Sequence, residues 1–491
     1  MLSVESPTKV YLDGFETSEL LKHLEYQDLR VNYELQKFKQ NKWYIRQYGE
    51  EAYQDKLQEL TKSLKKNLLL KQGGRYYTYS GLARLLASNL QSQLKWQIKY
   101  PDPRPLPWHK PLNFQLRPYQ NEAIEKFLEI RHGYGEYATG LGKTAIILML
   151  AKTLGLKTLV LAPSLNIAAQ LINLFNAHLG KQYVGAFFGS KKESNKLITI
   201  GIGQSLTKVK SGSQHFENFE KVEVFISDEA HTLPATTFEY VCMSLVANAP
   251  YRFFLTGTAL RNDGLDLLLK GIIGTEVASM SLQDGIQRKY LAKPQVVMVS
   301  TQSSTNQTSD DVNKMTRYHL YQNPAVNRAA AQLANKSVEH GKSVLILIDE
   351  FNQFNQIYPH LKYPVAFAHG PAGKDVIPAQ FAESNTPKLV EEFNQGKWPI
   401  LIGTSAVSTG TDFKRNQTTI YLVGGKSEIQ VRQGAIGRST RLMPEVNKDS
   451  CLIFDFDVVD IPILHKHAQI RRKIYEREIG TAVSSLKVEL K

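Results

Sequence analysis

Two glycines, a lysine and a threonine stand close together at Gly140, Gly142, Lys143 and Thr144, directly before an apolar pattern with helical spacing. Glycine allows positive φ and a close approach of the backbone to a ligand. The N-terminus of the helix that follows adds a partial positive charge. These residues predict a loop that holds a polyphosphate, with Lys143 at the β- and γ-phosphates and the Thr144 hydroxyl on a magnesium ion.

The loop departs at one position from the general pattern GxxxxGK[ST]. Tyr137 stands where that pattern has its first glycine. A glycine-rich turn between a strand and a helix, with a surface lysine, is the alternative interpretation. The choice between the two depends on the rest of the chain.

A pair of carboxylates supplies the second candidate group. Asp228 and Glu229 end the apolar run "VEVFISDEA" at 222–230. One carboxylate at the end of a strand can hold magnesium, and the second can orient or deprotonate an attacking water. A charged helix cap is the alternative. Because we expect the phosphate loop on a neighbouring strand, the two groups together predict a nucleoside triphosphatase.

The segment "QGAIGRSTR" contributes Gln433, Arg438 and Arg441. The two arginines are three residues apart and share one face if the segment is helical. Guanidinium groups from a second domain can stabilise the charge that develops on a γ-phosphate, in the manner of arginine fingers. A basic helical face is the alternative interpretation.

Short β-rich apolar runs alternate with helical patterns in two successive parts of the chain. The runs are 158–163, 197–203, 222–230 and 251–258, and then 343–349, 399–404, 418–425 and 451–457. Such alternation predicts α/β units with parallel sheets, whose ligands bind at the carboxyl ends of the strands. A polar stretch at 300–314 separates the two parts and is expected to be a loop.

The predicted domains follow from these patterns and from one linker. Residues 1–105 read as a mainly helical accessory domain, and the proline-rich segment at 100–111 ends it. The two α/β domains are predicted at 106–290 and 291–465. Residues 466–491 are predicted to form a helix that packs on the second domain or makes an additional DNA contact.

Composition indicates an ordinary globular protein of 491 residues with 42% apolar residues. Cys242 and Cys451 lack metal-ligand spacing and are expected in the core, so no structural metal is predicted. The chain starts without a signal-like segment and has no run of eighteen apolar residues. We therefore expect no membrane insertion and a cytoplasmic location, in the host cytoplasm if the chain is phage-encoded.

The formal net charge of +14 suggests a polyanionic partner, and its distribution is uneven. The stretch 61–100 contains no Asp or Glu, whereas it has eight basic residues interleaved with Tyr76, Tyr77, Tyr79 and Trp96. Basic side chains attract phosphates, and exposed aromatic rings stack on bases. This pattern predicts DNA binding by residues 1–105; a solvated helical face with core aromatics is the alternative.

Seven segments in order resemble the motif series of superfamily 2 helicases and translocases. They are "FQLRPYQ", "ATGLGKT", "LVLAPS", "ISDEAH", "LTGTALR", "GTSAVSTGTD" and "QGAIGRSTR", and the resemblance covers about 113–457. It implies two RecA-like domains of the P-loop type that use ATP and Mg²⁺, with a DEAH-box-like second motif. Within the superfamily, the size and the basic N-terminal part are similar to bacteriophage recombination helicases of the UvsW type.

The resemblance also implies roles for individual residues. Gln120 would recognise adenine, with Tyr119 or Arg117 near the base. The remaining nucleotide-binding positions are Thr139, Gly140, Leu141, Gly142, Gly410 and Asp412. Positions that couple hydrolysis to movement are His231, Thr256 and Thr258. Positions near the nucleic-acid backbone are Pro163, Ser164, Gln204, Ser205, Thr404 and Thr409.

The expected function is an ATP-dependent DNA helicase or translocase that unwinds or branch-migrates branched DNA in recombination, repair or replication. Lys143, Asp228 and Glu229 would act together with Gln433, Arg438 and Arg441. Single-stranded, forked or branched DNA is the expected partner. An RNA helicase, and a nucleic-acid clamp gated by ATP without productive turnover, are the two alternatives.

Overall fold

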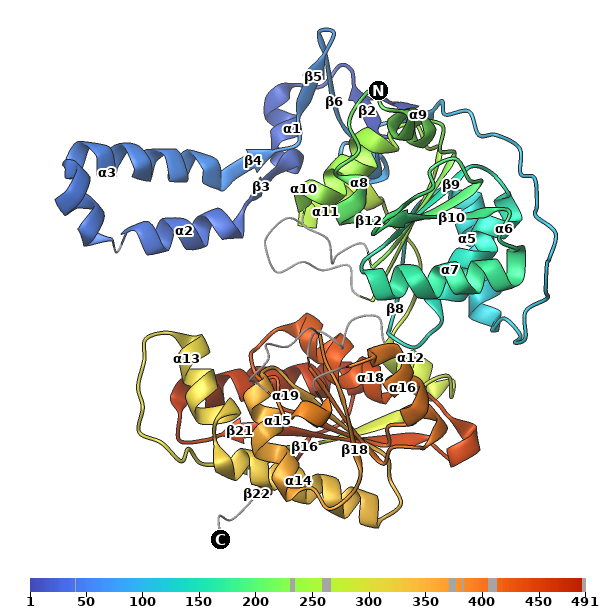
Figure 1. Cartoon of the computed structure of the whole chain (residues 1–491). Coiled ribbons are helices and arrows are strands. Elements are labelled where there is room, and N and C mark those ends of the chain that lie inside the picture. Colours follow the sequence, from blue (N-terminus) through green and yellow to red (C-terminus); the bar gives the residue numbers. More distant parts are fainter. Residues whose placement is uncertain are drawn as a thin grey trace. The chain divides into compact units, whose positions relative to one another are not determined.

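The computed structural model contains two compact units (Figure 1). It describes residues 1–39, 41–229, 235–257, 266–370, 377–381, 384–404 and 413–487. Unit 1 consists of Met1–Glu136 and Lys143–Ser279, and unit 2 of Tyr137–Gly142 and Met280–Lys491. The domain boundaries expected at 105, 290 and 465 stay predictions.

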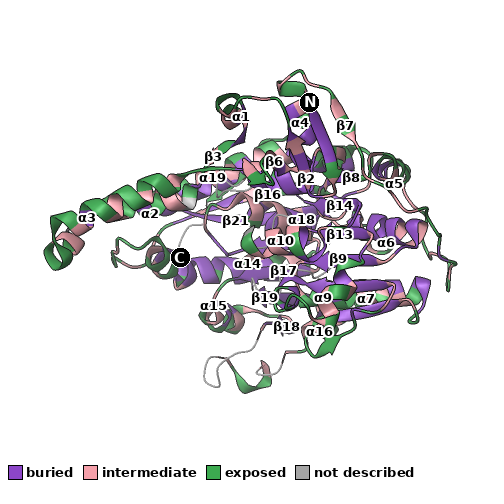
Figure 2. Cartoon of the chain, turned by 90° about the horizontal axis from the view of Figure 1, so that it is seen from above, coloured by how far each residue is buried: buried purple, intermediate pink, exposed green. Residues whose placement is uncertain are grey.

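An eight-stranded sheet in the order β11-β10-β12-β9-β13-β14-β8-β15 forms the centre of unit 1. The bounds are β8 His132–Tyr137, β9 Thr158–Ala162, β10 Val184–Phe188, β11 Lys191–Lys192, β12 Ile198–Ile202, β13 Val224–Asp228, β14 Tyr251–Thr256 and β15 Glu276–Met280. From β10 to β8 neighbouring strands are parallel, and β11 is antiparallel to β10. Strands β9, β12, β13 and β14 are buried along their whole length, which explains their continuous apolar sequences (Figure 2).

The helices of this part follow the strands and cover the sheet. They are α5 Pro118–Ile130, α6 Lys143–Leu154, α7 Leu165–Leu179, α8 Gly203–Leu206, α9 Gln214–Glu220, α10 Ala235–Tyr240 and α11 Asp266–Ile273. Helix α6 buries most of its side chains because it is apolar nearly all round. Helix α7 begins at the cap Ser164, whose Oγ accepts a hydrogen bond from the Ile167 amide.

The N-terminal part of unit 1 contains the expected helices but is organised on a sheet that we did not predict. Its strands, in the order β5-β6-β2-β1-β7, are β1 Leu2–Ser6, β2 Lys9–Leu12, β5 Leu70–Gln72, β6 Arg75–Tyr79 and β7 Leu94–Trp96. Its helices are α1 Thr17–Leu24, α2 Leu29–Lys39, α3 Lys42–Leu64 and α4 Ala83–Asn89. These strands have only three to five residues, too few for an alternating pattern to stand out in the sequence.

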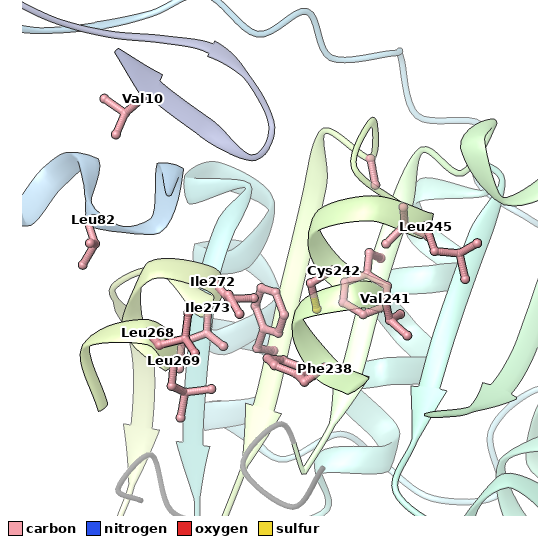
Figure 3. Close-up of a cluster of buried hydrophobic side chains, with 14 of the residues drawn as sticks. Val10, Leu82, Phe238, Val241, Cys242, Leu245, Leu268, Leu269, Ile272 and Ile273 are labelled. Carbon is pink, nitrogen blue, oxygen red and sulfur yellow. The ribbon is translucent and has the colours of Figure 1, made fainter. Parts of the chain in front are cut away.

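This N-terminal sheet shares one hydrophobic core with the large sheet of unit 1. Val10 and Leu82 belong to the same buried cluster as Leu268 and Ile272 of α11 (Figure 3). A Cβ placed on Gly81 would lie 2.5 Å from the carbonyl oxygen of Gly271, so the two backbones touch. Cys242 is also buried in this cluster, as expected for a core cysteine. Truncation of residues 1–105 would therefore expose apolar side chains of α11.

A seven-stranded sheet in the order β18-β19-β17-β20-β21-β16-β22 forms the centre of unit 2, and all its pairs are parallel. The strands are β16 Lys293–Thr301, β17 Val344–Ile348, β18 Val365–Ala368, β19 Ile400–Thr404, β20 Thr418–Tyr421, β21 Ser450–Val458 and β22 Ser484–Lys487. The helices are α12 Leu282–Gln287, α13 Val312–Thr316, α14 Pro324–Glu339, α15 Phe351–Ile357, α16 Thr386–Gln395, α18 Gly437–Ser439 and α19 Pro462–Ile479. Both units thus have the predicted parallel α/β architecture. Within the described residues, no helix combines the length and the apolar character required to cross a membrane.

The C-terminal segment differs from the helix expected over 466–491. Helix α19 ends at Ile479 because Gly480 adopts a left-handed conformation with φ of 75°. Residues Ser484–Lys487 then form β22, which pairs in parallel with β16. Arg471 of α19 is buried and forms an ion pair with Asp455 at 2.8 Å, so this helix packs on its own unit.

Candidate nucleotide site

The carboxyl ends of the parallel strands bring most predicted residues of unit 1 to one edge of its sheet. Lys143 follows β8, Asp228 ends β13 and Thr256 ends β14. The strand with the phosphate loop and the strand with the carboxylates are not neighbours, contrary to our expectation, because β14 lies between them. The order of strands within a sheet depends on long-range pairing and is not written in the order of the chain.

Lys143 bridges the intervening strand. It is the first residue of α6 and is 9% exposed. Its Nζ lies 2.9 Å from Oε1 of Glu229. Gly140 and Gly142 precede it with φ of 98° and 77°, as the glycine-rich pattern predicted. The lysine and glutamate side chains together cover the two strand spacings, roughly 10 Å, that separate β8 from β13.

Glu229 is held in an uncommon backbone conformation. Its φ is 49°, in the left-handed region that a residue with a side chain rarely adopts. Its Oε2 accepts a hydrogen bond of 2.9 Å from the amide of Gly257, just beyond the end of β14. Such a conformation costs about 1–3 kcal/mol and persists only where surrounding contacts impose it. Lys143 and Gly257 provide two such contacts, and the contact with Gly257 was not predicted from the sequence.

Asp228 provides a carboxylate that suits a cation. It is 6% exposed, and its Oδ1 is buried without a hydrogen-bond partner among the described residues. Burial raises the pKa of Asp228 above its ordinary value and the Glu229 carboxylate raises it further, whereas Lys143 has the opposite effect. A bound cation would satisfy the orphaned oxygen and favour its ionised form. The donor set of Asp228 with the exposed hydroxyl of Thr144 therefore fits Mg²⁺.

The residues that we expected to bind adenine form the N-terminal cap of their own helix, α5. Oε1 of Gln120 accepts a 2.9 Å hydrogen bond from the Arg117 amide, which closes a capping box at the start of α5. Nη1 of Arg117 donates to the Tyr119 hydroxyl at 3.2 Å. Tyr119 and Gln120 are buried. This structural role is compatible with an adenine contact, which stays a prediction.

The arginine segment of unit 2 is only partly helical. Gln433 lies in a π-helical stretch at Gln430–Ile436, and Arg438 lies in α18. The helix ends at Ser439, where the Oγ donates to Thr419 Oγ1 of β20 at 2.7 Å. Arg441 follows that end, so the condition for a shared helical face, a helix that includes both arginines, is not met.

Part of the phosphate loop groups with unit 2. A Cβ on Gly140 would lie 3.4 Å from Cδ of Arg441, and a Cβ on Gly437 would lie 2.7 Å from Cβ of Thr139. A side chain at position 437 would collide with Thr139, whereas one at position 140 would collide with the Leu291 side chain at 2.8 Å and only touch Arg441. Gly437 therefore allows a close approach of the arginine segment to the phosphate loop, which sequence spacing alone did not reveal.

The residues expected near a nucleic-acid backbone also lie at strand ends. Ser164 follows β9, and Gln204 and Ser205 follow β12. Thr404 ends β19 of unit 2, and its Oγ1 is buried without a partner among the described residues. Pro163 is partly buried and Gln204 is exposed.

A residue that we did not predict joins this group. Nζ of Lys192 donates to Ser205 Oγ at 3.2 Å and lies 5.0 Å from the centre of the Phe187 ring. The run "GSKKES" at 189–194 was its only signal in the sequence. Thr256 is buried at the end of β14. His231, Thr258, Thr409, Gly410 and Asp412 lie outside the described residues.

Comparisons with known proteins agree with this architecture. The family described as type III restriction enzyme, res subunit, matches residues 113–261. The chain is 23% identical over 393 residues to a DNA 3'-5' translocase XPB2 of Sulfurisphaera tokodaii, over 74% of this chain and 86% of that protein. It is 24% identical over 338 residues to a DNA 3'-5' helicase XPB of Kineococcus radiotolerans, over 66% of this chain but only 57% of that protein.

Solved structures show the same fold. A fragment of a putative HsdR subunit of a type I restriction enzyme from Vibrio vulnificus YJ016 aligns with a TM-score of 0.56 and 17% identity, over 77% of this chain and 69% of that one. T4 UvsW aligns over 99% of both chains, but its TM-score of 0.42 is too low to support the predicted UvsW-type likeness. The chain is therefore similar in sequence to DNA helicases and translocases, and its parallel-sheet units share the fold of the HsdR fragment.

Proposed function

We propose that the chain is an ATP-dependent DNA helicase or translocase. The observation that carries the proposal is the contact between Lys143 and Glu229 beside the buried carboxylate of Asp228. A triphosphatase needs a cation on the transferred phosphate, a carboxylate for the water and a metal ligand. All three lie at one edge of the unit 1 sheet.

Each residue at this edge of the unit 1 sheet has a separate proposed role in ATP hydrolysis. Lys143 binds the β- and γ-phosphates and gives up its contact with Glu229 as it does so. Glu229, freed from the lysine, orients the attacking water and accepts its proton. Asp228 and Thr144 would hold Mg²⁺, which would neutralise charge on the phosphate oxygens. Thr139, Leu141 and the loop glycines surround the phosphates with backbone amides.

Other residues complete the nucleotide site and transmit its state. Arg438 and Arg441, oriented by Gln433, stabilise the negative charge that develops on the γ-phosphate. The hydrogen bond from the Gly257 amide to Glu229 links the catalytic carboxylate to the end of β14, where Thr256 is located. Movement of this segment on hydrolysis is our proposed coupling route. The further proposed members are Arg117, Tyr119 and Gln120 at the adenine, Gly410 and Asp412 at the nucleotide, and His231 and Thr258 in coupling.

DNA is the proposed track. Both named relatives are DNA enzymes, and the net charge of +14 favours a polyanion. The small and hydroxyl-bearing residues at the strand ends suit contacts with phosphates, which position a strand without reading its sequence. Activity on forked or branched DNA in recombination or repair, including branch migration, is the finer proposal. The basic N-terminal part, which could hold a second segment of DNA, supports it.

Stimulation of ATP hydrolysis by different nucleic acids tests the choice of track. We expect single-stranded and forked DNA to stimulate turnover and RNA to have little effect, with ATP-dependent unwinding of tailed and four-way substrates. Exclusive stimulation by RNA would contradict the DNA assignment. Saturable DNA binding without multiple turnover would instead identify an ATP-gated clamp.

Replacement of Lys192 by alanine is expected to weaken DNA binding, because its ammonium lies beside Ser205 at the proposed backbone contact. Loss of one phosphate contact should reduce the slope of log K against log salt by about 0.7–0.9. Fluorescence anisotropy over a salt series measures this slope. Lys191→Ala is the matched control, since adjacent residues of a strand point to opposite faces. Equal effects of the two substitutions would remove Lys192 from the interface.

A further inference from the structure

Helices α2 and α3 form a hairpin whose turn is rich in basic and aromatic residues. They pack side by side and are joined to the rest of unit 1 by the two-stranded ribbon of β3 Glu25–Gln27 and β4 Lys65–Asn67 (Figure 1). We call residues 37–48, "KFKQNKWYIRQY", the hairpin tip. The tip has four basic and four aromatic residues and no Asp or Glu. It thus has the composition of a nucleic-acid-binding surface.

Internal contacts give the tip a defined structure. Asn41 caps α3 by accepting a hydrogen bond from the Tyr44 amide. Phe38 stacks on Tyr53 at 5.0 Å and meets Tyr44 edge-on at 4.9 Å. The hydroxyl of Tyr53 donates to the carbonyl of Lys39 at 3.3 Å. Three aromatic rings are therefore used to hold the turn together.

Two further aromatic rings of the tip are largely exposed, although Tyr48 also packs against Tyr44 with ring centres 4.8 Å apart. Trp43 is 61% exposed and Tyr48 is 54% exposed, and their rings meet nearly at right angles with centres 6.2 Å apart. Gly49, with φ of 84°, interrupts the helix directly after them. The first turns of α3 are therefore set apart from the rest of the helix, and they carry two large rings facing solvent.

Three basic residues of the tip, Lys37, Lys39 and Arg46, are also available to bind an anion. Lys37, Lys39 and Arg46 are exposed and form no ion pair within the part of the chain that the structure describes. The acid-free stretch at 61–100 differs in this respect. Arg75 is paired with Glu5 at 2.9 Å and Asp13 at 2.5 Å, and Lys66 with Asp28 at 3.0 Å. Acidic residues from elsewhere thus neutralise part of the segment that we expected to grip DNA.

We propose that the hairpin tip binds DNA at a junction between single and double strands. Lys37, Lys39 and Arg46 contact phosphates, and Trp43, supported by Tyr48, stacks on the first exposed base. Unpaired positive charge fits the backbone, and a solvent-facing aromatic ring fits a base that has lost its stacking partner. The assignment rests on the proposed function, since it deepens the DNA-binding activity of the same motor. It makes the tip the element that meets the fork.

The test measures binding of the full-length protein to a fluorescently labelled forked DNA and to a blunt duplex, without nucleotide. Trp43→Ala is expected to weaken forked-DNA binding about tenfold, with little change for the duplex. Trp43→Phe should retain most of the affinity, because the ring is kept. Tyr33→Ala is the matched control: Tyr33 is 71% exposed on the same hairpin but lies outside the tip. Unchanged binding by Trp43→Ala, or an equal loss in Tyr33→Ala, would overturn the proposal.

A salt series tests the phosphate contacts separately. The triple substitution of Lys37, Lys39 and Arg46 by alanine should reduce the salt slope by about 2–3, whereas Trp43→Ala should leave it unchanged. An unchanged slope in the triple variant, or an equal loss of forked-DNA and blunt-duplex binding in Trp43→Ala, would contradict binding at the fork. Circular dichroism confirms that the hairpin keeps its helical content.

ATP turnover without DNA separates failure of this inference from failure of the proposed function. Tip variants are expected to keep that basal turnover, because the tip contains no residue of the nucleotide site. If wild-type protein hydrolyses ATP with DNA stimulation but tip variants bind forks normally, only the tip assignment fails. If wild-type protein lacks DNA-stimulated hydrolysis, the proposed function itself fails.

Discussion

Replacing Glu229 by glutamine is expected to reduce DNA-stimulated ATP turnover by about 10²–10⁴-fold, the usual contribution of a positioned acid or base. The amide keeps the size of the carboxylate, and its oxygen can still accept the hydrogen bond from the Gly257 amide. It has no negative charge and cannot take a proton from water. We therefore expect nucleotide binding to persist while the chemical step is lost.

Steady-state phosphate release and equilibrium binding of a fluorescent nucleotide distinguish these two effects. Glu220→Gln is a suitable control, because this exposed glutamate lies on α9 of the same unit and forms no ion pair within the described residues. Wild-type turnover in the Glu229 variant would exclude its catalytic role. Loss of nucleotide binding together with turnover would show that the carboxylate organises the site and does not act on water.

Replacing Lys143 by alanine is expected to abolish tight ATP binding and to lower turnover about 10²–10³-fold, the cost of removing one preorganised cationic or hydrogen-bonding contact. The substitution also removes the ammonium that lies 2.9 Å from Glu229, and the side chains of the pair are only 10% and 14% exposed. Loss of one charged partner from such a pair costs roughly 1–3 kcal/mol of folding stability. We expect a lower unfolding temperature as well as lost activity.

The double variant Lys143→Ala/Glu229→Gln separates stability from function. Removing the negative charge of Glu229 as well should recover part of the lost stability, whereas ATP turnover should stay abolished. Thermal unfolding and phosphate release, measured on the two single variants and the double variant, complete the cycle. Equal unfolding temperatures in all variants would show that the 2.9 Å contact contributes nothing to the folded state.

Local patterns in the sequence predicted the backbone conformation of the glycine loop and the position of the carboxylates. The glycines before Lys143 adopt the positive φ that their spacing indicated, and Asp228 and Glu229 lie at the end of a buried strand. Each of these features is encoded within a few consecutive residues. The short N-terminal strands were not predicted because three to five residues are too few to show an alternating pattern. The helix that contains Arg438 ends at Ser439, before Arg441.

Partners from distant parts of the chain could not be predicted in this way. The Gly257 amide that fixes Glu229 is 28 residues away from it, and the carboxylates that neutralise Arg75 are more than 60 residues away. Lys192 joins Ser205 only because a short antiparallel turn folds back at the edge of the sheet.

By itself, the sequence determined where the glycine turn and the strand-terminal carboxylates lie, because backbone conformation and strand ends are set by neighbouring residues. Only the tertiary structure decided that β14 lies between the strand before Lys143 and the strand that ends at Asp228. It also decided that the N-terminal sheet packs on α11, and which basic side chains form ion pairs. Those outcomes depend on contacts between apolar faces and charges that are far apart in the sequence, and such contacts form only when the whole chain folds.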